Sequence, residues 1–158
     1  ACVGLFAPRM PLVRAAGVSS LSLASTARSA FIQEAAGYSA GVATPDGESF
    51  GYPRNLGVTS FVGVNLRTAI RVIDFYEPGD IVITNDAGTI GQHLNNVVMY
   101  TPVFAPDTGE LAAFFVVVVH WLDVGGPVIR SLSKSATELF LEGLQFRPGN
   151  LPTAGSTP

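Results

Sequence analysis

The chain has 158 residues, of which 47% are hydrophobic and 13% are charged, and its formal net charge is −3. This balance excludes a disordered tail and the clustered basic residues of a nucleic-acid interface. The single cysteine excludes an internal disulfide, and no stretch is long and apolar enough for a membrane span.

The charged fraction is low for a self-contained domain, in which about a quarter of the residues are charged. Low charge leaves few residues to cover a surface in contact with water. We therefore expect much of this chain to be covered by a further C-terminal region, by a partner subunit, or by both.

The first 24 residues show no clean hydrophobic period and contain Pro8 and Pro11. We expect them to be irregular and leave them unassigned. The absence of Asp and Glu from the first 33 residues keeps a transit peptide open as an alternative. Ser25 or Thr26 is suited to cap a helix that Gly37 would end.

The rest of the chain alternates between helical and extended patterns. Helical spacing of apolar residues predicts three helices, at 27–36, 59–75 and 135–144. Alternating or uninterrupted apolar runs between turn-forming residues predict five strands, at 38–44, 48–52, 81–84, 97–104 and 111–122. These elements predict an α+β fold with a mixed or antiparallel sheet and flanking helices, as part of a larger domain.

The two histidines of the chain, His93 and His120, lie where predicted strands meet loops. Strands 97–104 and 111–122 form a hairpin around the turn 105–109, so the start of one strand lies beside the end of the other. Both histidines should therefore come out at one edge of the sheet. Neutral imidazoles bind transition metals, although a strand-end histidine is also commonly a satisfied polar residue.

Other polar residues are predicted at the same edge. Asp86 and Asp123 follow strands and are candidates to position a catalytic water, although aspartates in loops also cap turns. Gly125 and Gly126 are turn formers or allow a ligand to approach the backbone. The sequence contains no P-loop, dinucleotide-binding or nucleophile-elbow motif.

Five segments resemble motifs of the hydantoinase B/oxoprolinase family, in the family's order. They are EPGDIVITND at 77–86, GQHLNN at 91–96, TPVF and GEL within 101–111, HWLDVGG at 120–126 and ATELFLEGL at 136–144. The resemblance covers about residues 25–151, which we take as a partial domain, and leaves 152–158 as a tail. Family members are several times longer, so the resemblance implies an N-terminal portion.

The resemblance also implies a site and a partner. Its metal-binding positions fall on His93, Asn96 and His120, where the ion would be manganese, zinc or iron. Asn96 stands where the family has an aspartate, which should weaken binding. Four residues within the motifs are assigned to the substrate: Asn85, Gly125, Gly126 and Glu142. ATP and Mg²⁺ are expected on a hydantoinase A-type partner subunit.

Three functions follow from the resemblance. The first is a portion of the B-type subunit of a cytoplasmic, ATP-dependent hydrolase that opens cyclic amides such as hydantoins or lactams, inactive without its partner. The second is a subunit of a carboxylase of small ketones such as acetone or acetophenone. The third is a truncated, non-catalytic fragment. None of these functions involves nucleic acid or a membrane.

Overall fold

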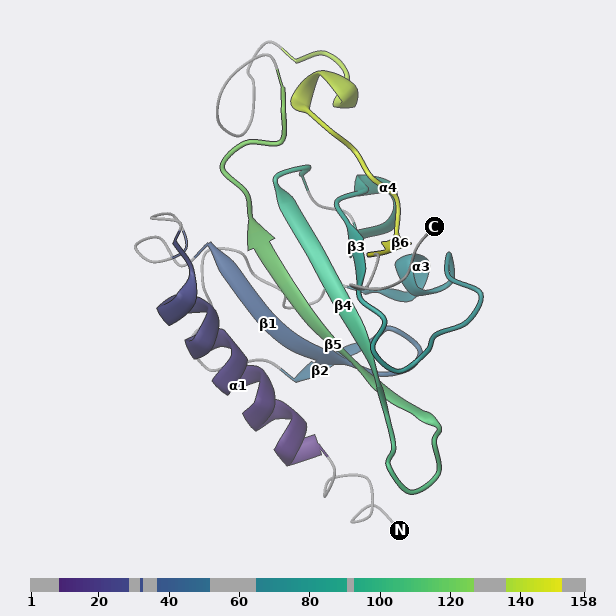
Figure 1. The fold of residues 1–158 in the computed structure, drawn as a ribbon. Helices are drawn as coiled ribbons and strands as arrows, with labels where there is room; N and C mark the ends of the chain where they lie inside the picture. The colour runs from purple at the N-terminus through teal and green to yellow at the C-terminus, as the bar shows by residue number, and fades with distance from the viewer. Residues whose placement is uncertain are drawn as a thin grey trace.

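The computed structural model describes residues 9–28, 32, 37–51, 65–90, 93–126 and 136–151. Their centre is a six-stranded antiparallel sheet in the order β2-β1-β5-β4-β3-β6 (Figure 1). The strands are β1 (Tyr38–Ala43), β2 (Ser49–Gly51), β3 (Val82–Thr84), β4 (Asn96–Phe104), β5 (Leu111–His120) and β6 (Gly149–Asn150). The α+β fold with an antiparallel sheet is confirmed. In the part of the chain that the structure describes, no helix is long and apolar enough to cross a membrane.

The expectation of an irregular N-terminus is wrong, because Arg9–Thr26 forms the helix α1, which lies along β1 (Figure 1). Pro11 is tolerated in the first turn, where the helix needs no amide hydrogen. The buried contact is made by the small side chain of Ala16 against Val42 of β1 and Ala113 of β5. Because this contact is made by a small side chain, the segment shows no clean helical spacing of large apolar residues, and the helix was not predicted.

The predicted cap at Ser25 or Thr26 is also wrong. Both residues lie in the last turn of α1, where their hydroxyls donate hydrogen bonds to Ser22 O at 3.0 and 2.6 Å. Most of the helix predicted at 27–36 lies outside the described residues.

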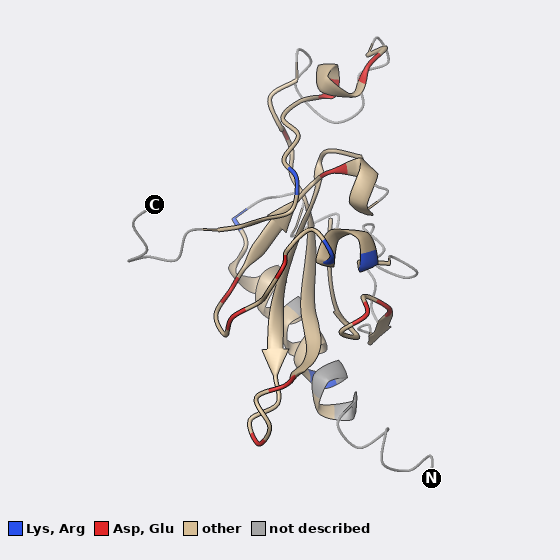
Figure 2. Cartoon of the chain, turned by 90° about the vertical axis from the view of Figure 1, so that its right-hand side faces the viewer, with Lys and Arg blue, Asp and Glu red and all other residues tan. Residues whose placement is uncertain are grey.

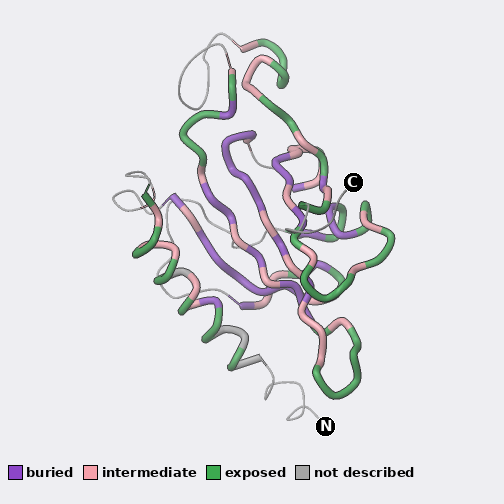
Figure 3. Tube along the Cα trace, viewed as in Figure 1, coloured by how far each residue is buried: buried purple, intermediate pink, exposed green. Residues whose placement is uncertain are grey.

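The long hairpin of β4 and β5 forms the middle of the core (Figure 3). One face of β5 places Phe114, Val116 and Val118 in the main cluster, while the other face places Ala113 against α1. Val116, Val118 and Val119 are buried and Val117 is half-buried, so burial on both faces explains why 116–119 shows no polar alternation. None of the six strands in the described residues contains Lys, Arg, Asp or Glu, and Figure 2 shows these residues mainly in turns and short helices.

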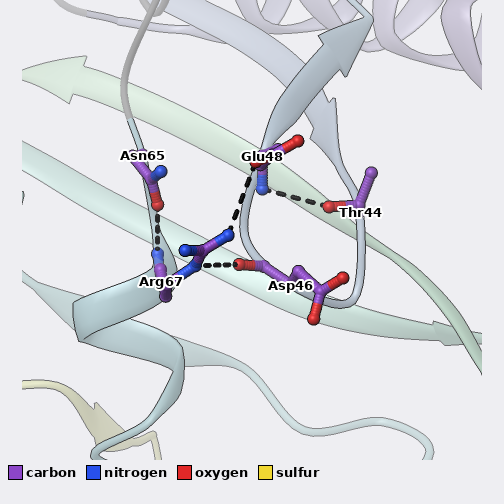
Figure 4. A network of polar contacts seen from close by, with 5 residues as sticks. All are labelled: Thr44, Asp46, Glu48, Asn65 and Arg67. Atoms are coloured by element: carbon purple, nitrogen blue, oxygen red, sulfur yellow. Dashed lines mark hydrogen bonds and ion pairs between the residues drawn. The ribbon is translucent and has the colours of Figure 1, made fainter.

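The turn between β1 and β2 is fastened to the start of α3 (Arg67–Ile70), as Figure 4 shows. The Arg67 guanidinium donates to Asp46 O and contacts the Glu48 carboxylate, each at 3.4 Å. Gly47 has φ +86°, and a Cβ there would lie 2.4 Å from Arg67 N, so only glycine fits. The strands predicted at 38–44 and 48–52 are confirmed over their described residues, and they pair with each other antiparallel.

Two predicted helices are shorter than expected. The helix predicted at 59–75 is described only from residue 65, and its helical part ends at Ile70 rather than Phe75, whose side chain is exposed. The segment predicted as a helix at 135–144 is a single 3₁₀ turn, η1 (Leu139–Glu142). The chain leaves η1 because Gly143 pairs with Gly125 and Leu144 N donates to Val124 O at 2.7 Å.

The segment after the strand predicted at 81–84 contains a short helix that was not predicted, α4 (Ala87–Ile90), which buries Ile90. The Pro- and Gly-rich tail after Arg147 adds β6 to the edge of the sheet, where it pairs with β3. Both segments therefore lie beside the C-terminal end of β3, which precedes His93 in the chain.

Candidate functional site

The two histidines meet at one end of the β4–β5 hairpin. His93 Nε2 lies 3.2 Å from His120 Nδ1, and the ring centroids are 5.1 Å apart. The strand register pairs Asn96 with His120, and a turn closed by Asn96 N donating to His93 O folds His93 back over this pair. The predicted convergence of the two imidazoles is confirmed.

Asn96 joins the same group of atoms. Its side chain is 7% exposed, and its Oδ1 lies 2.9 Å from His120 Nδ1. With Asn96 presenting its carbonyl oxygen, His120 Nδ1 is the donor and also faces the lone pair of His93 Nε2. The three residues predicted as metal ligands thus stand together, each with a nitrogen or oxygen atom in the cluster.

Burial lowers the pKa of both imidazoles from the ordinary value. For His93 this effect is partly opposed by the negative charge of Glu142, which raises the pKa. For His120 the neighbouring charge of His93 lowers the pKa further. Both shifts favour neutral rings, which are the form that presents a lone pair to a metal or accepts a proton.

The two predicted catalytic aspartates cap turns. Asp86 Oδ1 accepts hydrogen bonds from Gly88 N at 3.0 Å and from Gln145 Nε2 at 2.9 Å. Asp123 Oδ1 accepts from Gly125 N at 2.8 Å. Among the described residues, no group of three or more His, Cys, Asp or Glu side chains is placed to hold a metal. The aspartates therefore do not join the imidazoles as further ligands in this conformation.

Asn85, predicted to bind substrate, is fully buried. Its Nδ2 donates to Leu94 O at 2.9 Å and to Leu144 O at 2.8 Å, and its Oδ1 accepts from Phe146 N at 2.9 Å. Both amide hydrogens are used within the protein, so Asn85 offers no donor to a substrate. These contacts give Asn85 a structural role, in which it connects the backbone at Leu94 with that at Leu144 and Phe146.

The predicted substrate-binding glycines lie where two segments approach closely. Gly125 has φ +88° and pairs with Gly143, and a Cβ on Gly126 would lie 2.7 Å from Glu142 O. This approach brings Glu142, at the end of η1, close enough to His93 for its charge to act on that imidazole. Close packing alone accounts for both glycines.

A surface pocket of about 430 Å³ lies beside α4 and does not include either histidine. The sequence reasoning predicted only one of its lining residues, Asp86. Among the described residues, the pocket is lined by Val72, Asp86, Gly88, Thr89, Gln145, Arg147 and Pro148. Gln145 and Arg147 were missed because they follow the last matching motif, and their position beside Asp86 depends on the return of the chain to β3.

Comparison with known proteins identifies relatives of this chain. The chain is 38% identical over 77 residues to the caprolactamase subunit beta of Pseudomonas jessenii, covering 49% of this chain and 13% of that protein. It is 37% identical over 67 residues to the 5-oxoprolinase of Saccharomyces cerevisiae, covering 42% of this chain and 5% of that protein. The chain thus spans a small part of the length of these relatives.

Two solved structures share the fold. The ATP-dependent caprolactamase of P. jessenii superposes with a TM-score of 0.68 and 29% identity, over 93% of this chain and 26% of that chain. Nucleotide-free acetone carboxylase superposes with a TM-score of 0.71 over 92% of this chain and 20% of that chain. Its identity is 16%, so this likeness concerns the fold alone.

The sequence profile described as hydantoinase B/oxoprolinase matches residues 11–157. This match begins within α1, before the first motif that the sequence reasoning used. On this match, the chain belongs to the hydantoinase B/oxoprolinase family.

Proposed function

We propose that this chain is part of the B-type subunit of an ATP-dependent hydrolase that opens a cyclic amide, either a lactam or a hydantoin. The family and the names of two relatives, a caprolactamase and a 5-oxoprolinase, support the reaction class. The observation that carries the proposal is the cluster of His93 Nε2, His120 Nδ1 and Asn96 Oδ1 at the end of the sheet.

His93, Asn96 and His120 would hold a divalent metal, with manganese, zinc or iron as candidates. Two donor atoms that bind one ion at about 2.1 Å and at right angles lie about 3.0 Å apart. The separations of 3.2 and 2.9 Å are close to this value, and His120 Nδ1 would present its lone pair in the tautomer that carries the proton on Nε2. When bound, such an ion would polarise the carbonyl oxygen of an amide. The donor set is neutral, so we expect weaker binding than in relatives with a carboxylate at position 96.

The protein's own groups supply proton transfer. With the imidazole lone pairs directed at the ion, the carboxylate that orients the attacking water would accept a proton as water adds to the amide carbon, and would return it to the amide nitrogen as the carbon–nitrogen bond breaks. Asp123 is our first candidate to orient the water, because it follows His120 by three residues and its turn cap uses only Oδ1. Asp86 is the second candidate, and it lines the pocket beside α4.

A hydantoinase A-type partner would bind ATP and Mg²⁺. The word "subunit" in the name of the caprolactamase relative and the ATP dependence of the solved caprolactamase support such a complex. Large apolar side chains are exposed directly after His120 and in and after η1, which suits an interface. They are Trp121, Leu122, Phe140 and Leu144.

The test is ATP-dependent ring opening by the complex with an A-type partner, with caprolactam, 5-oxoproline and hydantoin as substrates. We expect His93→Ala and His120→Ala to reduce turnover by at least a hundredfold. Glu110→Gln, in the exposed turn at the opposite end of the hairpin, is the matched control and should leave turnover unchanged. Full activity of both histidine variants would refute the proposed site.

Ketone carboxylation is separated by the same preparation. It requires bicarbonate and a ketone, so ATP turnover that depends on bicarbonate and acetone would replace hydrolysis as the function. The likeness to acetone carboxylase is a likeness of fold and does not favour this alternative. Inactivity with every substrate, in a folded complex, would support the non-catalytic alternative.

A further inference from the structure

One buried amide connects the two segments that face each other across the candidate site. Asn85 Nδ2 donates one hydrogen bond to Leu94 O and another to Leu144 O, at 2.9 and 2.8 Å. Leu94 directly follows His93, and Leu144 lies two residues after Glu142. A single side chain therefore connects the backbone next to His93 with the backbone next to Glu142.

The connection extends along the segment 144–146. Phe146 N donates to Asn85 Oδ1 at 2.9 Å, and the Thr84 hydroxyl donates to Phe146 O at 3.0 Å. On the other side, Leu144 N donates to Val124 O at 2.7 Å. The segment 144–146, which begins two residues after Glu142, is thereby fixed to the end of β3 and to the chain that follows His120.

Only asparagine provides this set of contacts at position 85. The site requires two donors and one acceptor in a space that is closed to water. Aspartate has the same size but lacks both donors, serine has a single hydroxyl, and leucine has no polar atom. Loss of the donors leaves two buried carbonyl groups unsatisfied, and the segments on either side can then separate.

We propose that Asn85 is a positioning residue, which sets the separation between the His93 loop and the Glu142 segment and thereby the affinity of the site for a divalent metal. This inference rests on the proposed function, because it assigns Asn85 a task at the same site. Asn85 does not contact the ligand. It acts through the backbone of Leu94 and Leu144, and Glu142 is the carboxylate that it holds near His93.

The experiment compares Asn85→Ser and Asn85→Asp with Tyr100→Phe. The Tyr100 hydroxyl donates a buried hydrogen bond to Ala69 O at 3.0 Å, in the core beside α3, so its loss is a matched control for reduced stability. Mn²⁺ binding is measured by the electron paramagnetic resonance of the free ion, under conditions where each variant is folded. Loss of an outer contact of a metal ligand typically weakens binding by about 10–100-fold. We expect a loss in this range for both Asn85 variants and a change of less than about twofold for Tyr100→Phe.

A second readout does not depend on metal. The chain has two histidines, so selective ¹⁵N labelling gives one set of ring signals for each. We expect Asn85→Ser to shift the His93 ring signals and to speed hydrogen exchange at the Leu144 amide, while Tyr100→Phe leaves both unchanged. Unchanged ring signals in Asn85→Ser, or Mn²⁺ affinity equal to that of the unmodified chain, would overturn the inference. Absence of Mn²⁺ binding by the unmodified chain would instead refute the metal site, and the ring signals would still decide the role of Asn85.

Discussion

Replacing Asn96 with aspartate tests the proposed metal site most directly. Asn96 Oδ1 already lies 2.9 Å from His120 Nδ1, so Asn96→Asp changes the charge of the donor and almost nothing of its shape. We expect the variant to bind Mn²⁺ and Zn²⁺ more tightly than the unmodified chain, because a carboxylate is a stronger ligand than an amide oxygen.

The magnitude follows from two opposing effects. At an effective dielectric constant of about 20, two unit charges 4 Å apart attract by about 4 kcal/mol, and the attraction of a dication is about twice this value. Asn96 is 7% exposed, so most of this gain is lost in removing the new carboxylate from water. A remainder of about 1.4–2.8 kcal/mol corresponds to a 10–100-fold increase in affinity.

The same desolvation affects the metal-free protein. We expect metal-free Asn96→Asp to be about 1–3 kcal/mol less stable, with stability regained as metal is added. Isothermal titration calorimetry gives the affinity, and urea unfolding with and without metal gives the linkage.

The control for this prediction is Asn95→Asp, which places the same charge one residue earlier. Asn95 is also buried, and its Nδ2 donates to Trp121 O at 2.9 Å. This variant should lose stability without a gain in metal affinity. If Asn96→Asp binds metal no more tightly than the unmodified chain, or if Asn95→Asp gains as much, the three-residue site is wrong.

Three further predictions follow from the structure. The pKa values of His93 and His120 are lowered in the folded chain, so the unfolded chain takes up protons first as the pH falls. The free energy of unfolding should therefore fall as the pH drops through about 6.5. In urea unfolding between pH 7.5 and 5.5, a His93→Gln/His120→Gln variant should lose this dependence. Glu142→Gln removes a charge that raises the pKa of His93, so an NMR titration should show that pKa falling further, and an unchanged value would place Glu142 away from the site. Gly126→Ala would put a Cβ 2.7 Å from Glu142 O and should lower the free energy of unfolding by about 1–3 kcal/mol. Gly17→Ala, in a helix with nothing within 4 Å of the new Cβ, should raise it by about 0.5–1 kcal/mol. Equal thermal unfolding of the two variants would contradict this packing.

The sheet could be predicted because most of its strands have a local pattern of apolar residues between turn-forming residues. The run at 111–122 is too apolar for a surface strand, and the turn at 105–109 fixes its partner, so the hairpin and the meeting of His93 with His120 followed from the sequence. The family motifs then placed Asn96 beside them, and the strand register agrees, since Asn96 pairs with His120.

The errors occurred where tertiary contacts decide the structure. Helix α1 is held by Ala16, whose small side chain gives no periodic signal. The apolar spacing at 135–144 suits an α-helix, but the pairing of Gly143 with Gly125 draws the chain out after one 3₁₀ turn. The motif that contains Asn85 does not show what its amide contacts, because two of its three backbone partners, Leu144 and Phe146, lie 59 and 61 residues further along the chain.

The donor set of the cluster bears on how the site would work in a complex. Two neutral imidazoles and an amide carry no negative charge, so an ion bound there keeps its full charge, and water competes with these neutral ligands. Trp121 and Leu122, which directly follow His120, are 41% and 51% exposed. A partner that covers them would exclude water from the imidazoles and strengthen each electrostatic contact, including that with Glu142. We therefore expect metal affinity to rise when the A-type partner binds, and by linkage the partner to bind more tightly when metal is present.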